Sequence, residues 1–130
     1  MKLLDRLIRL AACATLAVAA GGANLPSALV GPGEWEVSTS AATSGDRICL
    51  MDPTLLLQWE HRGKRCERAI LSSSPEHADV QYHCSGGGFG TSKVEELTPR
   101  TVRIESQGIS DGYPFAFVLH ARRVGPCQSH

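Results

Sequence analysis

The stretch TVRIESQGISDGYPFAFVLHA, Thr101 to Ala121, contains two segments of alternating side chains around an Asp-Gly pair. Asp111-Gly112 is a dipeptide favoured at the two central positions of a tight hairpin turn. Pairing the two segments about this turn places apolar residues opposite one another on one face. These residues are Val102 and Ile104 in the first segment and Leu119 and Ala121 in the second. We therefore predict an antiparallel hairpin with an apolar inner face.

The opposite face of this hairpin carries charged and titratable side chains. They are Arg103, Glu105, His120 and Arg122. An exposed cross-strand cluster of charges is the plain interpretation, and an acid–base site is the alternative.

The chain upstream has the same pattern of short strands separated by turns. CERAILSSS (66–74) and HADVQYHC (77–84) flank a turn at Ser74-Pro75, and GTSKVEEL (90–97) precedes a turn at 98–100. Proline and small polar residues punctuate strands in this way. From Cys66 onward the sequence therefore predicts a meander.

A further strand is predicted near residue 35. In GPGEWEVSTS, Trp35 and Val37 alternate with Glu34 and Glu36, the period of a strand with one buried face. The two glutamates then point away from the core together. We interpret them as a solvated strand face, with a catalytic carboxylate pair as the alternative. The segment RICL (47–50) predicts a second short strand.

One helix is predicted in MDPTLLLQWEHRG, residues 51–63. Asp52 suits the cap, Pro53 suits the first helical position and Gly63 suits the end. The face expected to be buried consists of Leu55, Leu56 and Trp59. With the strands, this predicts a mainly β fold with a minor α component. We expect a curved antiparallel meander or half-barrel of about six or seven strands with one short helix and two disulfides.

Four of the five cysteines lie in the predicted domain, at positions 49, 66, 84 and 127. An even number in a small exported domain predicts two disulfides. Cys66 and Cys84 lie equally far from the turn at Pro75, so they face each other across a hairpin. This favours Cys66 with Cys84 and Cys49 with Cys127, although the other two connectivities stay open.

A metal site is the competing interpretation of these cysteines. His61, His83 and His130 lie near Cys66, Cys84 and Cys127 in the sequence. No pair has the tight spacing that organises tetrahedral zinc, so we expect no metal and no cofactor.

The N-terminus has the layout of a secretory signal peptide. Lys2, Arg6 and Arg9 precede the apolar run LAACATLAVAA, and small residues that allow cleavage follow at 20–23. The run is too short to span a bilayer. We predict a signal peptide at 1–22, a single domain at 23–130 and a periplasmic or secreted location. The alternatives are a retained amphipathic helix and a lipoprotein in which the LAAC box is cleaved and Cys13 is lipidated.

The charge balance excludes some partners. Removing residues 1–22 takes three of the 13 Lys and Arg and one of the 13 Asp and Glu, which leaves 10 against 12 and a net charge of about −2. Nucleic acids and anionic membranes are usually bound by a clustered basic surface, so we expect neither, and no transmembrane anchor after cleavage. The glycine-rich SGGGFGTSK (85–93) lacks the order of a phosphate-binding loop, and we expect a flexible or bulged strand connection there.

Several features together resemble a family of small exported bacterial proteins catalogued as a domain of unknown function. They are PGEWEV (32–37), Cys49-Leu50 before a short helix, the Cys66 to Cys84 hairpin, glycines at 86–90 and RRVGPC (122–127). The resemblance implies a periplasmic or secreted protein and supplies no catalytic residues. Gly33-Glu34-Trp35 also resembles the G-x-W of lipocalins, in three residues only.

Two classes of function are open. The first is a non-enzymatic module that binds a small apolar ligand, a lipid or a protein partner. Inward positions that line a cavity, or simply form the core, are Trp35, Val37, Tyr82, Phe115, Phe117 and Leu119. The alternative is a small hydrolase or lyase that uses Glu34 or Glu36 with His83 or His120. No nucleophile motif stands out, so we expect no catalytic residue; a filled core with shallow grooves would favour a protein-interaction module.

Overall fold

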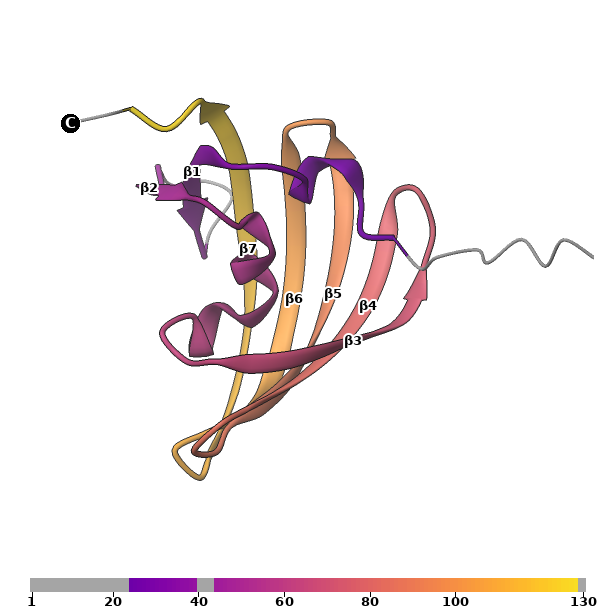
Figure 1. Cartoon of the computed structure of the whole chain (residues 1–130), viewed down its shortest axis with the longest axis vertical. Coiled ribbons are helices and arrows are strands. Elements are labelled where there is room, and N and C mark those ends of the chain that lie inside the picture. Colours follow the sequence, from indigo (N-terminus) through magenta and orange to yellow (C-terminus); the bar gives the residue numbers. More distant parts are fainter. Residues whose placement is uncertain (1–23, 40–43, 129–130) are drawn as a thin grey trace, which may run out of the picture.

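The computed structural model describes residues 24–39 and 44–128. Seven antiparallel strands form one open sheet in the order β2-β1-β7-β6-β5-β4-β3 (Figure 1). The strands are β1 (Gly33–Ser38), β2 (Asp46–Leu50), β3 (Cys66–Ser73), β4 (His77–Cys84), β5 (Phe89–Thr98), β6 (Thr101–Ser110) and β7 (Tyr113–Gly125). Two short 3-10 helices, η1 (Ser27–Leu29) and η2 (Pro53–His61), complete the described part of the chain. The predicted mainly β fold is confirmed.

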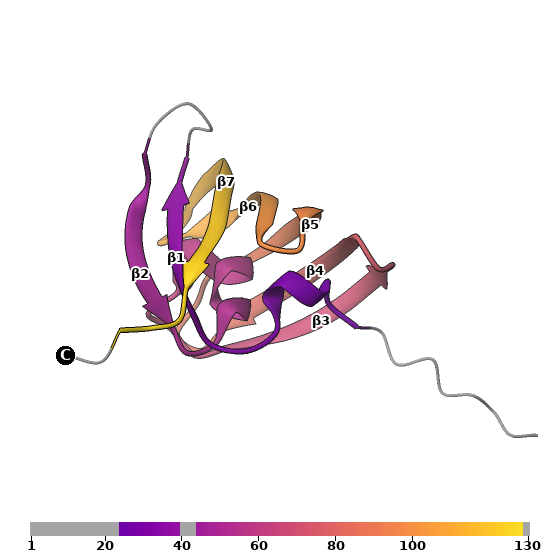
Figure 2. The ribbon, with the colours of Figure 1, turned by 90° about the horizontal axis from the view of Figure 1, so that it is seen from above.

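The sheet is strongly curved, and η2 lies on its concave side (Figures 1 and 2). Strands β2 and β3 are its two edges. The concave side is filled by apolar side chains from the sheet and from both helices. Trp35, Leu56 and Leu57 are each completely shielded from solvent there. Because both helices pack against the concave side of the sheet, the core of the half-barrel is filled by protein side chains.

The hairpin of β6 and β7 has the register expected from the sequence. Val102 faces Ala121 and Ile104 faces Leu119. At the turn, Asp111 and Gly112 have φ angles of 50° and 82°. Two consecutive positive φ values are what a type I′ hairpin turn requires, and Asp-Gly provides them at low steric cost.

The predicted short helix is confirmed at Pro53–His61, with Asp52 at its cap and Pro53 at its first position. The Oδ1 atom of Asp52 accepts hydrogen bonds from the backbone N and the hydroxyl of Thr54, which hold the pKa of Asp52 below its usual value. However, η2 is a 3-10 helix interrupted at Gln58 (φ −127°, ψ 40°), and it ends at His61 rather than at Gly63.

The buried face of η2 also differs from the prediction. The buried residues are Pro53, Leu56, Leu57, Gln58 and His61, whereas Leu55 and Trp59 are only partly buried. Three residues per turn, in place of 3.6, and the break in the middle rotate the side chains away from the α-helical pattern. The side-chain amide of Gln58 is satisfied in the interior, since it donates to the carbonyls of His61 and Lys64 and accepts from Arg68.

Both favoured disulfides are confirmed. Cys49 is bonded to Cys127 and Cys66 to Cys84, and Cys66 lies directly opposite Cys84 in the β3–β4 register. The first bond ties β2 to the segment after β7. Two disulfides in a small domain are typical of an oxidising extracellular or periplasmic environment.

The predicted signal peptide (1–22), with Cys13, lies outside the described residues, as do residues 40–43 and His130. In the described part of the chain, no helix is long and apolar enough to cross a membrane.

The segment before β1 is held by one side chain. The guanidinium of Arg123 donates hydrogen bonds of 2.9–3.2 Å to the carbonyls of Ala28, Val30, Gly31 and Pro32. It also lies 5.2 Å from the centre of the Trp35 ring. Arg123 therefore joins the end of β7 to the entry of β1.

Candidate functional site

The residues expected to line a cavity belong to the core or its border. Trp35, Val37, Tyr82 and Leu119 are buried, and Phe117 packs partly buried against them. Phe115 is also partly buried, next to His61. Val37 and Leu119 border a cleft between the β1–β2 hairpin and η2, whose other lining residues are mostly polar. This arrangement resembles a filled core more than a ligand cavity.

An apolar groove lies instead on the outer, convex side of the sheet. Two hollows of about 440 and 800 Å³ share Thr91, Gln107 and Ala116, and so form one continuous groove over β4 to β7. We call it the outer groove. Its other lining residues are Gln81, Phe89, Gly90, Lys93, Glu105, Ser106, Gly108, Ile109, Pro114, Phe115, Phe117 and Val118.

Two glycines allow the backbones to approach closely at this groove. Gly90 faces Gly108 in the β5–β6 register. A Cβ atom on Gly108 would lie 2.1 Å from the carbonyl oxygen of Phe89. Any larger residue at this position would push the two strands apart.

The outer groove has chemically distinct parts. At the end near the β6–β7 turn it is apolar, with Phe89 53% exposed beside Ile109 and Pro114. Next to this, the side-chain amides of Gln81 and Gln107 make no hydrogen bond with a described residue and remain available as donors and acceptors. Lys93 and Glu105 face each other in register at the other end. The groove thus offers apolar contact and amide hydrogen bonding side by side.

The residues considered for acid–base chemistry do not form a cleft site. His83 lies 3.3 Å from Glu67, but their side chains are 70% and 85% exposed on the surface. Glu36 forms ion pairs with Arg47 and Arg122, and the side chain of Glu34 makes no hydrogen bond or ion pair with a described residue. His120 lies opposite Arg103 in the cross-strand charge cluster expected from the sequence.

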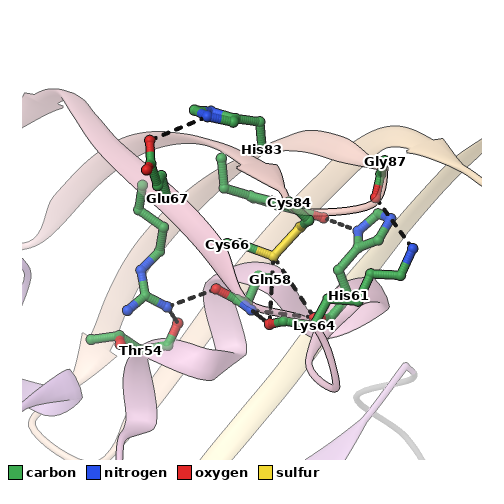
Figure 3. The surroundings of a disulfide bond; sticks show 11 residues. Thr54, Gln58, His61, Lys64, Cys66, Glu67, His83, Cys84 and Gly87 are labelled. Carbon is green, nitrogen blue, oxygen red and sulfur yellow. Dashed lines mark hydrogen bonds and ion pairs between the residues drawn. A yellow bond between two sulfur atoms is a disulfide. The ribbon is translucent and has the colours of Figure 1, made fainter.

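A buried histidine–tyrosine pair was missed by the sequence analysis. The Nδ1 atom of His61 lies 2.8 Å from the hydroxyl of Tyr82, and its Nε2 atom is buried without a partner in the described residues. A Cβ atom on Gly88 would lie 2.4 Å from Nε2, and one on Gly90 would lie 2.8 Å from the Tyr82 hydroxyl. Gly88 in the β4–β5 connection and Gly90 in β5 therefore make room for this pair. His61 lies beside the Cys66–Cys84 disulfide (Figure 3).

The tyrosine of this pair gives a prediction about pH. Burial, with a smaller contribution from the charge of Glu60, raises the pKa of Tyr82 to about 12 from 10.0. Because the folded state disfavours the phenolate, this contribution to stability is complete below pH 10 and is lost as the pH rises through about 12. We expect the phenolate absorbance of Tyr82, measured as the difference between the protein and Tyr82→Phe, to appear near pH 12 in the folded protein. In denaturant it should appear near pH 10, and a folded-state midpoint near 10 would contradict the buried position.

No group of three or more His, Cys, Asp and Glu side chains that could hold a metal ion occurs within residues 24–39 and 44–128. A scan against models of known protein families, a search of curated proteins and a search of solved structures each found no match to the chain. The resemblance to small exported proteins of unknown function stays a prediction.

Proposed function

We propose that the protein is a non-enzymatic interaction module, exported by a cleaved signal peptide at residues 1–22, that binds an extended segment of a partner protein in the outer groove. The observation that supports this most is the distribution of apolar residues on the sheet. The inner face is covered by η1, η2 and the core. The outer face would be expected to be polar, yet it carries the apolar part of the groove.

The chemistry of the groove suits a polypeptide. Exposed apolar groups such as Phe89, Ile109 and Pro114 can cover side chains of a partner. The free amides of Gln81 and Gln107 can donate to and accept from peptide groups. A small apolar ligand would leave these amides without partners, which costs free energy on burial.

The shape of the groove also favours a segment of protein over a carried small ligand. It is open along the sheet and runs over four strands. The interior, where a carrier encloses its ligand, is occupied by Trp35, Leu56 and Leu57. Carriers usually bury most of the surface of a small ligand, which an open groove does not do.

Photo-crosslinking in the producing cell tests this function. We expect a benzoyl-phenylalanine residue in place of Phe89 to give one discrete, protease-sensitive adduct of higher mass. The same residue in place of Leu71, which is 60% exposed on the edge strand β3, is the matched control and should give none. Ala116→Arg, which fills the groove from an exposed position, should remove the adduct while the circular dichroism spectrum is unchanged.

Other outcomes would refute the proposal. Equal crosslinking from positions 89 and 71, or no adduct from position 89, would exclude the outer groove as a specific protein-binding surface. An adduct of the mass of a lipid at position 89 would replace the protein partner with a lipid.

A further inference from the structure

A separate hollow of about 480 Å³ lies where β2 and β7 approach the hairpin that joins β5 to β6. Its lining residues are Arg47, Thr98, Arg100, Thr101, Arg122, Arg123 and Val124. We call it the arginine cleft. It shares no lining residue with the outer groove.

The strand order of the sheet brings these residues together. Arg47 faces Glu36, Glu36 faces Arg122, and Arg122 faces Thr101 in three successive strand pairs. Thr101 in turn faces Thr98. These five residues form one row across β2, β1, β7, β6 and β5. Side chains in such a row stand next to one another on one face of the sheet.

The four arginines of the cleft differ in their hydrogen bonding. The guanidinium of Arg123 donates through Nη1 and Nη2 to the carbonyls of residues 28 and 30–32. By contrast, the guanidinium groups of Arg47, Arg100 and Arg122 donate no hydrogen bond to a described residue. Each guanidinium has five N–H donors, so the cleft holds many positively charged hydrogen-bond donors without a partner.

One carboxylate partly neutralises the arginine cleft. Glu36 lies 3.7 Å from Arg47 and 3.6 Å from Arg122, beyond hydrogen-bonding distance. The Arg47 and Arg122 side chains are 61% and 60% exposed, so these ion pairs are weak. Arg100 has no ion pair with a described residue. The three positive charges of Arg47, Arg100 and Arg122 therefore exceed the one negative charge of Glu36 by two.

We propose that the arginine cleft binds a phosphate group. The free donors come from β2, from β7 and from the β5–β6 hairpin, and donors from several directions match the tetrahedral oxygens of phosphate better than a planar carboxylate. Arginine forks bind phosphate with charge-assisted hydrogen bonds. The hydroxyls of Thr98 and Thr101 add neutral donors.

The backbone holds the hairpin side of the cleft in place. The carbonyl of Arg100 accepts a hydrogen bond of 2.8 Å from the backbone N of Arg123, and the backbone N of Arg100 donates to the Thr98 hydroxyl. The volume of about 480 Å³ exceeds that of one phosphate. A phosphate carried by a larger molecule, such as a lipid headgroup, therefore fits as well as the free ion. This proposal is independent of a partner in the outer groove.

A nuclear magnetic resonance titration of the folded, disulfide-bonded mature chain with inorganic phosphate tests the proposal. At constant ionic strength we expect saturable shifts at the amides of Thr98, Arg100 and Arg122. Acetate should produce weaker binding. Arg100→Gln should weaken phosphate binding about tenfold, the typical effect of one charge-assisted hydrogen bond.

Two further variants separate a specific site from general electrostatics. Arg65→Gln removes the same charge at an exposed position outside the cleft and should leave binding unchanged. Glu36→Gln removes the competing carboxylate and should strengthen phosphate binding. A purely structural role of Glu36 predicts no such gain.

The source of the phosphate is tested with vesicles. Sedimentation of the protein with phosphatidylglycerol vesicles, but not with phosphatidylcholine vesicles, and its loss in Arg100→Gln would identify a lipid headgroup. Binding of free phosphate without sedimentation would identify a soluble phosphate. No saturable shift up to millimolar phosphate and no sedimentation, or equal weakening by Arg100→Gln and Arg65→Gln, would overturn the proposal.

Discussion

Replacing Trp35 by alanine is expected to lower the free energy of unfolding by about 3–5 kcal/mol, the range for removal of a buried aromatic side chain. Trp35 is 0% exposed. It joins the core to the guanidinium of Arg123, whose hydrogen bonds hold the entry of β1. Its Nε1 atom has no hydrogen-bond partner among the described residues, so the loss comes from packing. Urea unfolding followed by far-ultraviolet circular dichroism measures it.

The two glutamates beside this tryptophan provide the matched control. Glu34→Gln combined with Glu36→Gln changes the outer face of the same strand and should shift stability by less than about 1 kcal/mol. If Trp35→Ala does not fold, Trp35→Phe, which keeps an aromatic ring, should still be less stable than the double glutamine variant. A loss from the glutamine variant as large as that from the tryptophan variant would contradict the assignment of the two faces.

Local patterns predict the strands and the hairpin pairings because each depends on residues close together in the chain. Alternation assigns Trp35 and Val37 to the inner face, and Asp111-Gly112 fixes the β6–β7 register. The Cys66–Cys84 bond follows from the equal distance of both cysteines from one turn. The kind of helix in η2 was not predictable in this way, since the break at Gln58 depends on its hydrogen bonds to residues in a loop and in β3.

Both surfaces proposed for binding depend on information that a local pattern lacks. The arginine cleft exists because β1 lies between β2 and β7 in the sheet. This order brings Arg47 and Arg122 into one row, although they are 75 positions apart in the sequence. The balance of 13 basic and 13 acidic residues in the whole chain, with a net charge of about −2 after removal of residues 1–22, gave no sign of such a cluster. The outer groove combines residues of β4, β5, β6 and β7, and a local pattern does not show which residues of four strands share one hollow.

The two disulfides are expected to contribute unequally to the free energy of unfolding, and this is the second prediction of large effect. The Cys49–Cys127 bond has a sequence separation of 78 and the Cys66–Cys84 bond one of 18. A crosslink that closes a longer loop removes more conformational freedom from the unfolded chain. We expect Cys49→Ala with Cys127→Ala to cost about 4–5 kcal/mol and Cys66→Ala with Cys84→Ala about 3 kcal/mol.

Urea unfolding of the two double variants measures this difference, and each variant is the control for the other because both remove two sulfur atoms and one bond. A larger loss from the shorter loop would show that the Cys66–Cys84 bond acts mainly on the folded hairpin and on the buried His61–Tyr82 pair beside it.

Small domains have a net stability of about 5–15 kcal/mol, so removal of both bonds should leave little or none. We therefore expect the reduced protein to be largely unfolded, and full retention of the β-sheet spectrum in reductant would contradict the dependence of this fold on an oxidising compartment.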